Sequence, residues 1–133
     1  MESLYFEPIG FGQRATLSDT LEIAIRSSDV WNAYRDSLHP IAPFDSVDFS
    51  QVVVLLAAVP LSTSGHSIEF ISVDIVDTLA IAEYVVQIAG EDCLTAYSET
   101  VPFQAVLARR TELPVEFRRH EEEYRCTFGP HRR

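Results

Sequence analysis

Lysine is absent from this chain, and all ten of its basic residues are arginine. They stand against 20 acidic residues, so the formal net charge at pH 7 is −10. Residues 1–108 hold 15 acids and only three arginines, whereas residues 109–133 hold seven arginines and five acids. Because a negative field of this size repels phosphate backbones, the composition argues against nucleic acid as a partner.

The missing lysine has two explanations, and the sequence leaves both open. Dense surface carboxylates keep a protein dissolved at high salt, so the composition fits a halophilic source. A GC-rich genome that prefers arginine codons would remove lysine equally well.

No apolar run approaches the ~18 residues of a membrane-spanning helix, and the longest, residues 52–59, has the length of a strand. We therefore expect no membrane span. The first residues, Met1, Glu2 and Ser3, lack the basic flank and apolar stretch of a signal peptide. Either the protein is cytoplasmic or a leader that preceded this sequence has been removed.

Cysteine is scarce as well, with only Cys93 and Cys126 in the chain. Two cysteines alone cannot supply the four ligands of a structural zinc site, and no two of the four histidines have helical i, i+4 spacing. We expect neither a metal nor a cofactor. Both cysteines fall in polar, loop-like stretches, which favours a disulfide between them. The alternative is two free thiols in a reducing cytoplasm.

The length of 133 residues, 47% of them hydrophobic, fits one domain with its own core. The strand at residues 52–59 is apolar on both faces, so we expect it to be covered on both sides. A slip of the alternation near Phe70 and Ile71 predicts a β-bulge. Alternation or β-branched composition predicts strands over residues 4–9, 20–26, 52–59, 66–77, 79–88, 103–108 and 115–117.

One amphipathic helix is predicted over about residues 29–39, with Pro40 ending it because proline breaks the hydrogen-bond ladder. The predicted fold is mainly β (α+β): a twisted antiparallel sheet, as a curled barrel or two-layer sandwich, with this helix packed on it. The domain would span residues 1–118, followed by a charged tail, residues 119–133. Burial is expected for Trp31, Tyr34, Val53, Leu55, Ile71 and Val73.

Catalytic motifs are missing from the sequence. The serine of Gly65-His66-Ser67 lacks the flanking glycines of a nucleophile elbow. A triad of Ser67, His66 and Asp74 is disfavoured because adjacent strand residues point to opposite faces. Gly10-Phe11-Gly12 lacks the third glycine and the following helix of a phosphate loop, and predicts a turn instead. We expect no catalytic residue.

Several stretches in order resemble the C-terminal domain of PrcB-type protease-complex subunits. They are residues 10–13, the run from Arg26 to Trp31, residues 48–59, residues 62–68, and Thr100-Val101-Pro102-Phe103. The similarity as a whole extends over about residues 5–117. Ser64 stands where the family usually has glycine, and His66 where it usually has tyrosine. The resemblance implies an exported bacterial protein that associates with a protease and does not itself catalyse.

A candidate binding surface lies in the loop between two of the most hydrophobic predicted strands. Small hydroxyls could meet a partner backbone, glycine permits close approach, and a histidine could make binding depend on pH. The alternative is that this loop has a structural role only, as a turn between the two strands. The candidate residues are Ser62, Thr63, Ser64, Gly65 and His66, with Thr100, Pro102 and Phe103 expected nearby.

Three functions remain open at this point. The first is a non-catalytic protein-binding module that stabilises or escorts a protein partner, such as a protease in the bacterial cell envelope. The second is a protease inhibitor that inserts residues 62–66, a loop distantly similar to that of chagasin-like inhibitors. The third is a ligand binder or enzyme with a cavity between helix and sheet. A dimer through a free strand edge is compatible with each of them.

Overall fold

The structure is a computed structural model that describes residues 2–39 and 47–126. Its strands form two four-stranded sheets: sheet A in the order β1-β7-β8-β10 and sheet B in the order β2-β9-β6-β4. A two-stranded pair, β3 with β5, completes the described β-structure. The elements are β1 (Glu2–Ser3), β2 (Phe6–Gly12), β3 (Arg14–Ala15), β4 (Leu21–Ile25), α1 (Ser28–Arg35), β5 (Leu38–His39), β6 (Val52–Ala58), β7 (Ser67–Val76), β8 (Leu79–Ala89), β9 (Phe103–Arg109) and β10 (Val115–Tyr124).

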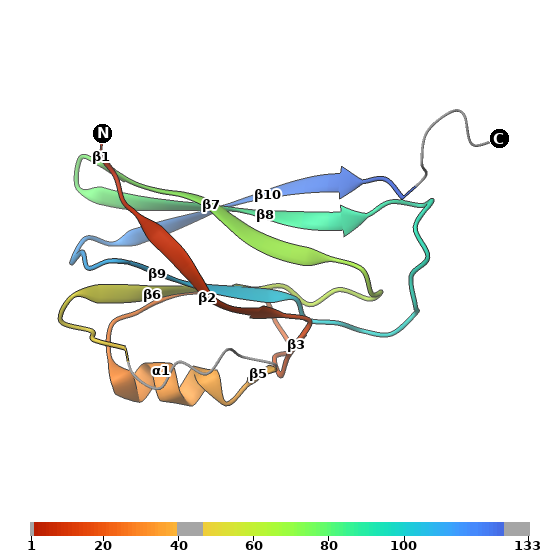
Figure 1. The fold of residues 1–133 in the computed structure, drawn as a ribbon, viewed down its shortest axis with the longest axis horizontal. Helices are drawn as coiled ribbons and strands as arrows, with labels where there is room; N and C mark the ends of the chain where they lie inside the picture. Colours follow the sequence, from red (N-terminus) through yellow and green to blue (C-terminus); the bar gives the residue numbers. More distant parts are fainter. Residues whose placement is uncertain (1, 40–46, 127–133) are drawn as a thin grey trace.

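The two sheets pack face to face as a sandwich, and α1 covers the other face of sheet B (Figure 1). Sheet B is antiparallel throughout, and sheet A is antiparallel except for the parallel pairing of β10 with β8. The predicted mainly β fold is confirmed in its two-layer form, with one helix on the outside. In the described part of the chain, no helix is long and apolar enough to cross a bilayer.

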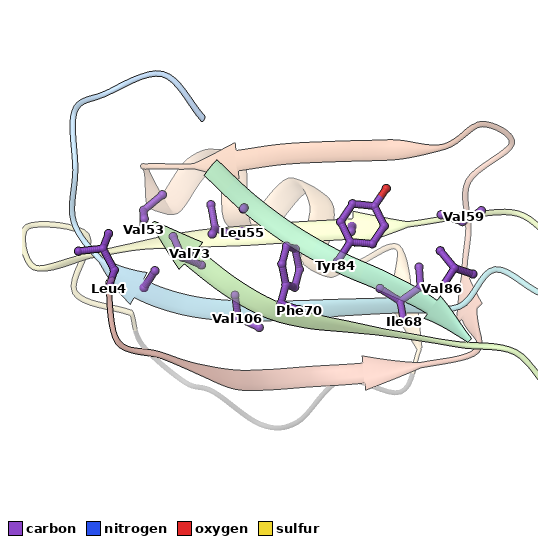
Figure 2. Packing of buried hydrophobic residues seen from close by; sticks show 13 residues of the cluster. Leu4, Val53, Leu55, Val59, Ile68, Phe70, Val73, Tyr84, Val86 and Val106 are labelled. Atoms are coloured by element: carbon purple, nitrogen blue, oxygen red, sulfur yellow. The ribbon is translucent and has the colours of Figure 1, made fainter. Parts of the chain in front are cut away.

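Strand β6 separates two hydrophobic clusters, because its residues alternate between them. Val53 and Leu55 point into the space between the sheets, where they meet Phe70 and Tyr84 of sheet A (Figure 2). The intervening side chains of β6, such as Leu56, point toward the helix side. The prediction that this strand is covered on both faces is therefore confirmed.

Helix α1 is shorter than predicted. Ser27 is its N-cap, and the Ser27 hydroxyl accepts a hydrogen bond from the Val30 amide at 3.3 Å. Trp31 is only 3% exposed and docks the helix on sheet B, as expected, while Tyr34 is half-buried. The helix ends at Arg35 because Leu38, which continues the helical spacing, instead pairs with Ala15 in a strand and is buried there. The predicted stop at Pro40 lies outside the described residues.

The predicted bulge is present in β7, where the register with β8 shifts between Phe70 and Ser72. The extra residue is Ile71, which is 50% exposed, so the prediction that it is buried was wrong. The bulge returns Val73 to the same inner face as Phe70. The Phe70 amide finds its partner in the Gln104 side-chain oxygen of the opposite sheet, at 2.7 Å.

The end of the chain also differs from its prediction. The sequence predicts a charged tail from residue 119, but β10 continues to Tyr124 in unbroken register with β8. The sequence does not reveal this extension because residues 118–123 are charged on both faces of the strand. An exposed edge strand needs no alternation of apolar and polar residues. At the other end, the turn expected at residues 10–12 is part of β2, whose irregularity lies between Pro8 and Gly10. Residues 40–46 and 127–133 lie outside the description.

Candidate functional site

Two loops meet at one end of the sandwich. The first, called here the inner loop, is residues 61–66 between β6 and β7, and it contains most of the predicted binding residues. The second, called the outer loop, is residues 90–99 between β8 and β9. The two loops contact each other and the end of β10, so they form one unit.

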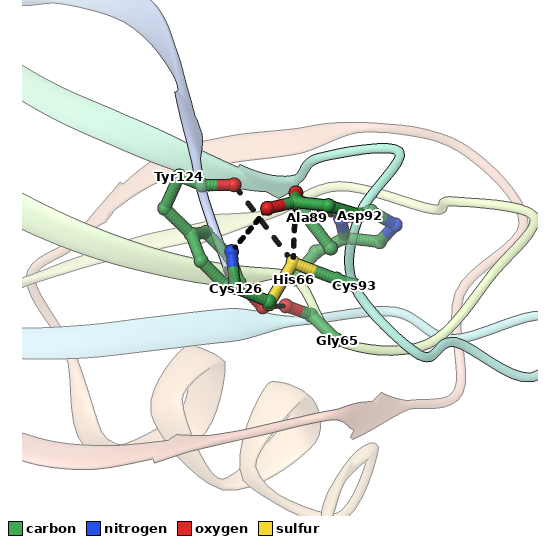
Figure 3. Close-up of a disulfide and its surroundings, with 7 residues drawn as sticks. All are labelled: Gly65, His66, Ala89, Asp92, Cys93, Tyr124 and Cys126. Carbon is green, nitrogen blue, oxygen red and sulfur yellow. Dashed lines mark hydrogen bonds between the residues drawn. A yellow bond between two sulfur atoms is a disulfide. The ribbon is translucent and has the colours of Figure 1, made fainter. Parts of the chain in front are cut away.

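A cross-link holds the outer loop to the end of β10. As predicted, Cys93 and Cys126 lie at disulfide distance, with 1.98 Å between the sulfur atoms and 4.9 Å between the Cα atoms (Figure 3). Hydrogen bonds surround this link. The Cys126 amide donates to the Asp92 carboxylate at 2.9 Å, and the Gly90 amide donates to the Tyr124 carbonyl at 3.0 Å. The first half of the outer loop is thereby tied to the scaffold.

The second half of the outer loop rests on the inner loop. The Ala96 amide donates to the Ser64 hydroxyl at 2.8 Å, and the Ser64 amide donates to the Ala96 carbonyl at 3.1 Å. Leu61 and Thr100 exchange backbone hydrogen bonds of 2.8 and 2.9 Å, and the Thr100 hydroxyl donates to the Thr63 carbonyl at 2.8 Å. Thr100 thus lies beside the inner loop, as expected. The hydroxyls of Ser64 and Thr100, which were expected to meet a partner, are therefore engaged within the chain.

Gly65 permits a close approach of the chain to itself. Its φ of 95° lies in the region that favours glycine. A Cβ atom at this position would come within 3.3 Å of both the Ala89 Cβ and the Thr95 Cγ2. The Tyr124 hydroxyl, from β10, donates a hydrogen bond to the Gly65 carbonyl. The glycine therefore makes room for the outer loop and β10.

His66 is buried beneath the two loops, with 5% of its surface exposed (Figure 3). Its Nδ1 accepts a hydrogen bond from the Ala89 amide at 3.0 Å, so the neutral ring carries its proton on Nε2 and donates to the Thr63 hydroxyl at 2.7 Å. Burial lowers the pKa of His66 because it removes water from the charged form. The ring is thus a neutral support of the inner loop, whereas the sequence suggested a charge switch on a binding surface.

The remaining predicted binding residues fall into two groups. Pro102 and Phe103 are fully buried, with Phe103 in the cluster between sheet B and α1, so they cannot touch a partner in this conformation. Their apolar character reflects this position in the core. Ser62 and Gly65 are exposed, and Thr63, Ser64 and Thr100 are partly exposed.

Two residues of the outer loop, Leu94 and Tyr97, were not among the predicted binding residues. They are the most exposed large hydrophobic side chains of the described chain, at 103% and 98%. Each lies one residue after an anchor of the loop: Leu94 follows Cys93, and Tyr97 follows Ala96. A leucine and a tyrosine inside an otherwise polar loop beside a cysteine were the signal that could have found them.

An open cleft of about 820 Å³ lies next to the outer loop, between residues 13–18 and residues 98–101. Its charged lining residues are Arg14 and Glu99, and Thr100 belongs to it as well. The third hypothesis from the sequence was a ligand cavity between helix and sheet. Hydrophobic side chains around Trp31 fill the space between α1 and sheet B. Within residues 2–39 and 47–126, no three histidine, cysteine, aspartate or glutamate side chains are placed to hold a metal ion.

Comparisons of the chain with protein-family models, with curated proteins and with solved structures found no match.

Proposed function

We propose that this chain is a non-catalytic protein-binding module whose contact surface is the outer loop, with Leu94 and Tyr97 as its anchoring side chains. The observation that carries the proposal is their nearly complete exposure on a loop that is otherwise tied down. Burial of a large apolar side chain against a partner removes it from water and so favours binding. Tyrosine is also among the residues enriched at the energetic centres of interfaces.

The anchoring of the loop favours binding because it lowers the entropy lost on association. A free loop must be ordered when a partner binds, at about 0.5–1.5 kcal/mol for each immobilised flexible side chain, before backbone terms are added. Here Cys93 is cross-linked, and both the amide and the carbonyl of Ala96 are hydrogen-bonded to Ser64. Leu94 and Tyr97 thus stand on a backbone that is already anchored beside each of them. The inner loop serves as the base on which the contact residues stand.

The charge of the site suggests the chemistry of the partner. The outer loop carries the acids Glu91, Asp92 and Glu99 and no basic residue, and residues 1–108 as a whole hold 15 acids against three arginines. Complementary potentials steer association and select partners. A fitting partner therefore offers an apolar pocket for Leu94 or Tyr97 with basic residues around it.

The finer proposal concerns the partner's identity and its compartment. The resemblance to PrcB-type domains supports a protease or another protein of the bacterial cell envelope, which this chain would stabilise or escort. A cross-link between Cys93 and Cys126 is compatible with such an oxidising compartment, where disulfides persist.

The test is quantitative capture with the full chain, comparing wild type with the double variant Leu94→Ala/Tyr97→Ala. The matched control is Phe11→Ala/Tyr5→Ala, which removes two exposed aromatic side chains from another part of the surface. We expect a partner that wild type and the control retain and that the loop variant loses. For the purified partner, the loop variant should raise the dissociation constant by about 30-fold or more, the effect of removing hot-spot side chains.

A partner that binds wild type and the loop variant equally would overturn the assignment of the surface. Enzymatic turnover by the purified chain would overturn the non-catalytic assignment. If the partner is a protease, its half-life and its rate of substrate cleavage with and without the chain distinguish stabilisation from inhibition.

A further inference from the structure

The free edges of the two sheets differ in how well they are protected against pairing with another strand. Natural proteins blunt such edges with short strands, bulges, prolines or charges. Three of the edge strands follow this rule: β1 has two residues, β4 has five, and β2 contains Pro8 and an irregularity beside it. Strand β10 is different, since its ten residues run in unbroken register with β8 and include no proline.

In the part of the chain that the structure describes, β10 is protected by its charge alone, and the order of its charges is unusual. Arg118 and Arg119 precede His120, and Glu121 and Glu122 follow it. A block of one sign would repel a second copy of the same strand. This arrangement reverses sign about its centre, so it is complementary to itself when one copy runs antiparallel to the other.

We propose that β10 pairs with β10 of a second copy of this chain, antiparallel and centred on His120. In this register Arg118 of each copy lies opposite Glu122 of the other, and Arg119 lies opposite Glu121. Because the twofold axis is perpendicular to the sheet, each pair occurs twice. Sheet A then continues from one protomer into the other, which satisfies the free backbone groups of both edges.

The described structure leaves these side chains able to form the pairs. Among the described residues, Arg118 pairs with Glu116 of its own strand at 2.5 Å, and Arg119 pairs with Glu121. The Glu122 carboxylate accepts a hydrogen bond from the Gln87 side chain at 3.3 Å. The Arg118 side chain is 50% exposed and that of Glu121 is 55% exposed. A guanidinium has five N–H donors, so each arginine can keep its neighbour and also bind a carboxylate across the interface.

The first test combines two charge reversals in the full chain. Arg118→Glu/Arg119→Glu makes all four flanking charges negative, and Glu121→Arg/Glu122→Arg makes them all positive. We expect wild type to sediment as a dimer and each variant to have a dissociation constant raised by about 100-fold. An equal mixture of the two variants should form a heterodimer, because in it every arginine again faces a glutamate.

The matched control exchanges all four residues, as Arg118→Glu/Arg119→Glu/Glu121→Arg/Glu122→Arg. Its net charge equals that of wild type and its pattern is again self-complementary, so it should form a dimer with itself but not with wild type. Wild type that stays monomeric near ~100 μM, a concentration far above the dissociation constants of specific interfaces, would overturn the proposal. A dimer that survives both reversals, or reversal variants that do not recombine, would overturn it equally.

A second test does not depend on how well the charge variants fold. In the proposed register position 120 lies opposite its own copy, with Cα atoms about 4.5–5.5 Å apart, which is within reach of a disulfide. His120→Cys should therefore cross-link under mild oxidation, and the peptide map should show the two substituted positions joined to each other. Arg118→Cys is the control, since its two copies would lie about 14 Å apart. Equal cross-linking of the two variants would contradict the register.

Discussion

The inner and outer loops lie against each other and yet have opposite relations to solvent. The inner loop, residues 61–66, turns its polar groups inward: Ser64 and Thr63 bond to the chain, and His66 is buried. The outer loop, residues 90–99, bonds through its backbone and the cross-link of Cys93, and leaves Leu94 and Tyr97 in water. The hydroxyls and the glycine of the inner loop, which suggested a binding surface in the sequence, hold the two loops together. The residues now proposed to contact a partner, Leu94 and Tyr97, have large hydrophobic side chains.

The difference teaches that polar composition does not decide whether a loop binds a partner. A polar side chain next to a second loop finds its hydrogen-bond partner there, because unsatisfied polar groups are costly once water is excluded. An apolar side chain gains nothing from such a contact unless the core accepts it. Substitutions of the hydrogen-bonded or buried residues of the inner loop should therefore change stability, and substitutions of the exposed apolar residues of the outer loop should change binding.

The largest effect should come from removing the link that joins the outer loop to β10. We expect Cys93→Ser/Cys126→Ser to lower the free energy of unfolding by roughly 3–4 kcal/mol, since the cross-link closes a sequence separation of 33 residues. The measurement is urea unfolding of both proteins under non-reducing conditions. If the two curves coincide, the cross-link is not formed in solution; mass analysis with and without reductant would check this independently.

Gly65→Ala should destabilise the protein by about 1–3 kcal/mol, the second largest effect. The new Cβ is strained at a φ of 95° and crowds Ala89 and Thr95 at 3.3 Å. The neighbouring Ser62→Ala, at an exposed position, serves as the control and should stay within about 0.5 kcal/mol of wild type. Thermal or urea unfolding measures both. Equal stability of Gly65→Ala and wild type would mean that the loops separate in solution.

His66 makes the support of the inner loop dependent on pH. Its pKa is lowered in the folded protein, so below pH 6.5 the unfolded chain takes up the proton first and stability falls. The neutral His66 ring makes its full contribution to the free energy of unfolding above pH 6.5. This contribution is lost as the pH falls toward the folded pKa, and the free energy of unfolding then changes by at most about 1.4 kcal/mol per pH unit.

The measurement for His66 is the difference in unfolding free energy between wild type and His66→Gln from about pH 8 to about pH 5, the range over which histidine changes charge. The difference cancels the titration of the other histidines. We expect it to shrink as the pH falls, because only wild type loses this contribution. A constant difference would show that His66 is not a buried neutral ring.

The smallest effect on stability should come from the outer loop itself. Leu94→Ala and Tyr97→Ala each remove a side chain that contacts water, so the free energy of unfolding should change by no more than about 0.5 kcal/mol. Chemical unfolding measures this change. A loss above about 1 kcal/mol, beyond the range of neutral surface changes, would place these side chains in the folded core and remove the separation between supporting and contacting loops.

Much of the architecture could be predicted from local patterns. The β6 strand was recognisable because it is apolar on both faces, and the β7 bulge because the alternation slips near Phe70. The turn at Asp77, whose φ is 57°, lies where the two predicted strands over residues 66–77 and 79–88 meet. Helix α1 was recognisable from its amphipathic pattern, but its end was not, since Leu38 leaves the helix to pair with Ala15. Periodicity shows which face of a strand or helix is apolar, but it does not show which other element of the chain packs against that face.

The sequence by itself determined the two sheets' main strands, the single helix, the acidic character and the only cysteine pair that could form. The tertiary structure alone decided what each polar or charged segment does. It extended the strand predicted at residues 115–117 to Tyr124 by laying β10 beside β8, buried His66 under two loops, and left Leu94 in water. The physical reason is that apolar patterns follow from burial along one element, whereas a polar group's role depends on which distant group comes within hydrogen-bond distance.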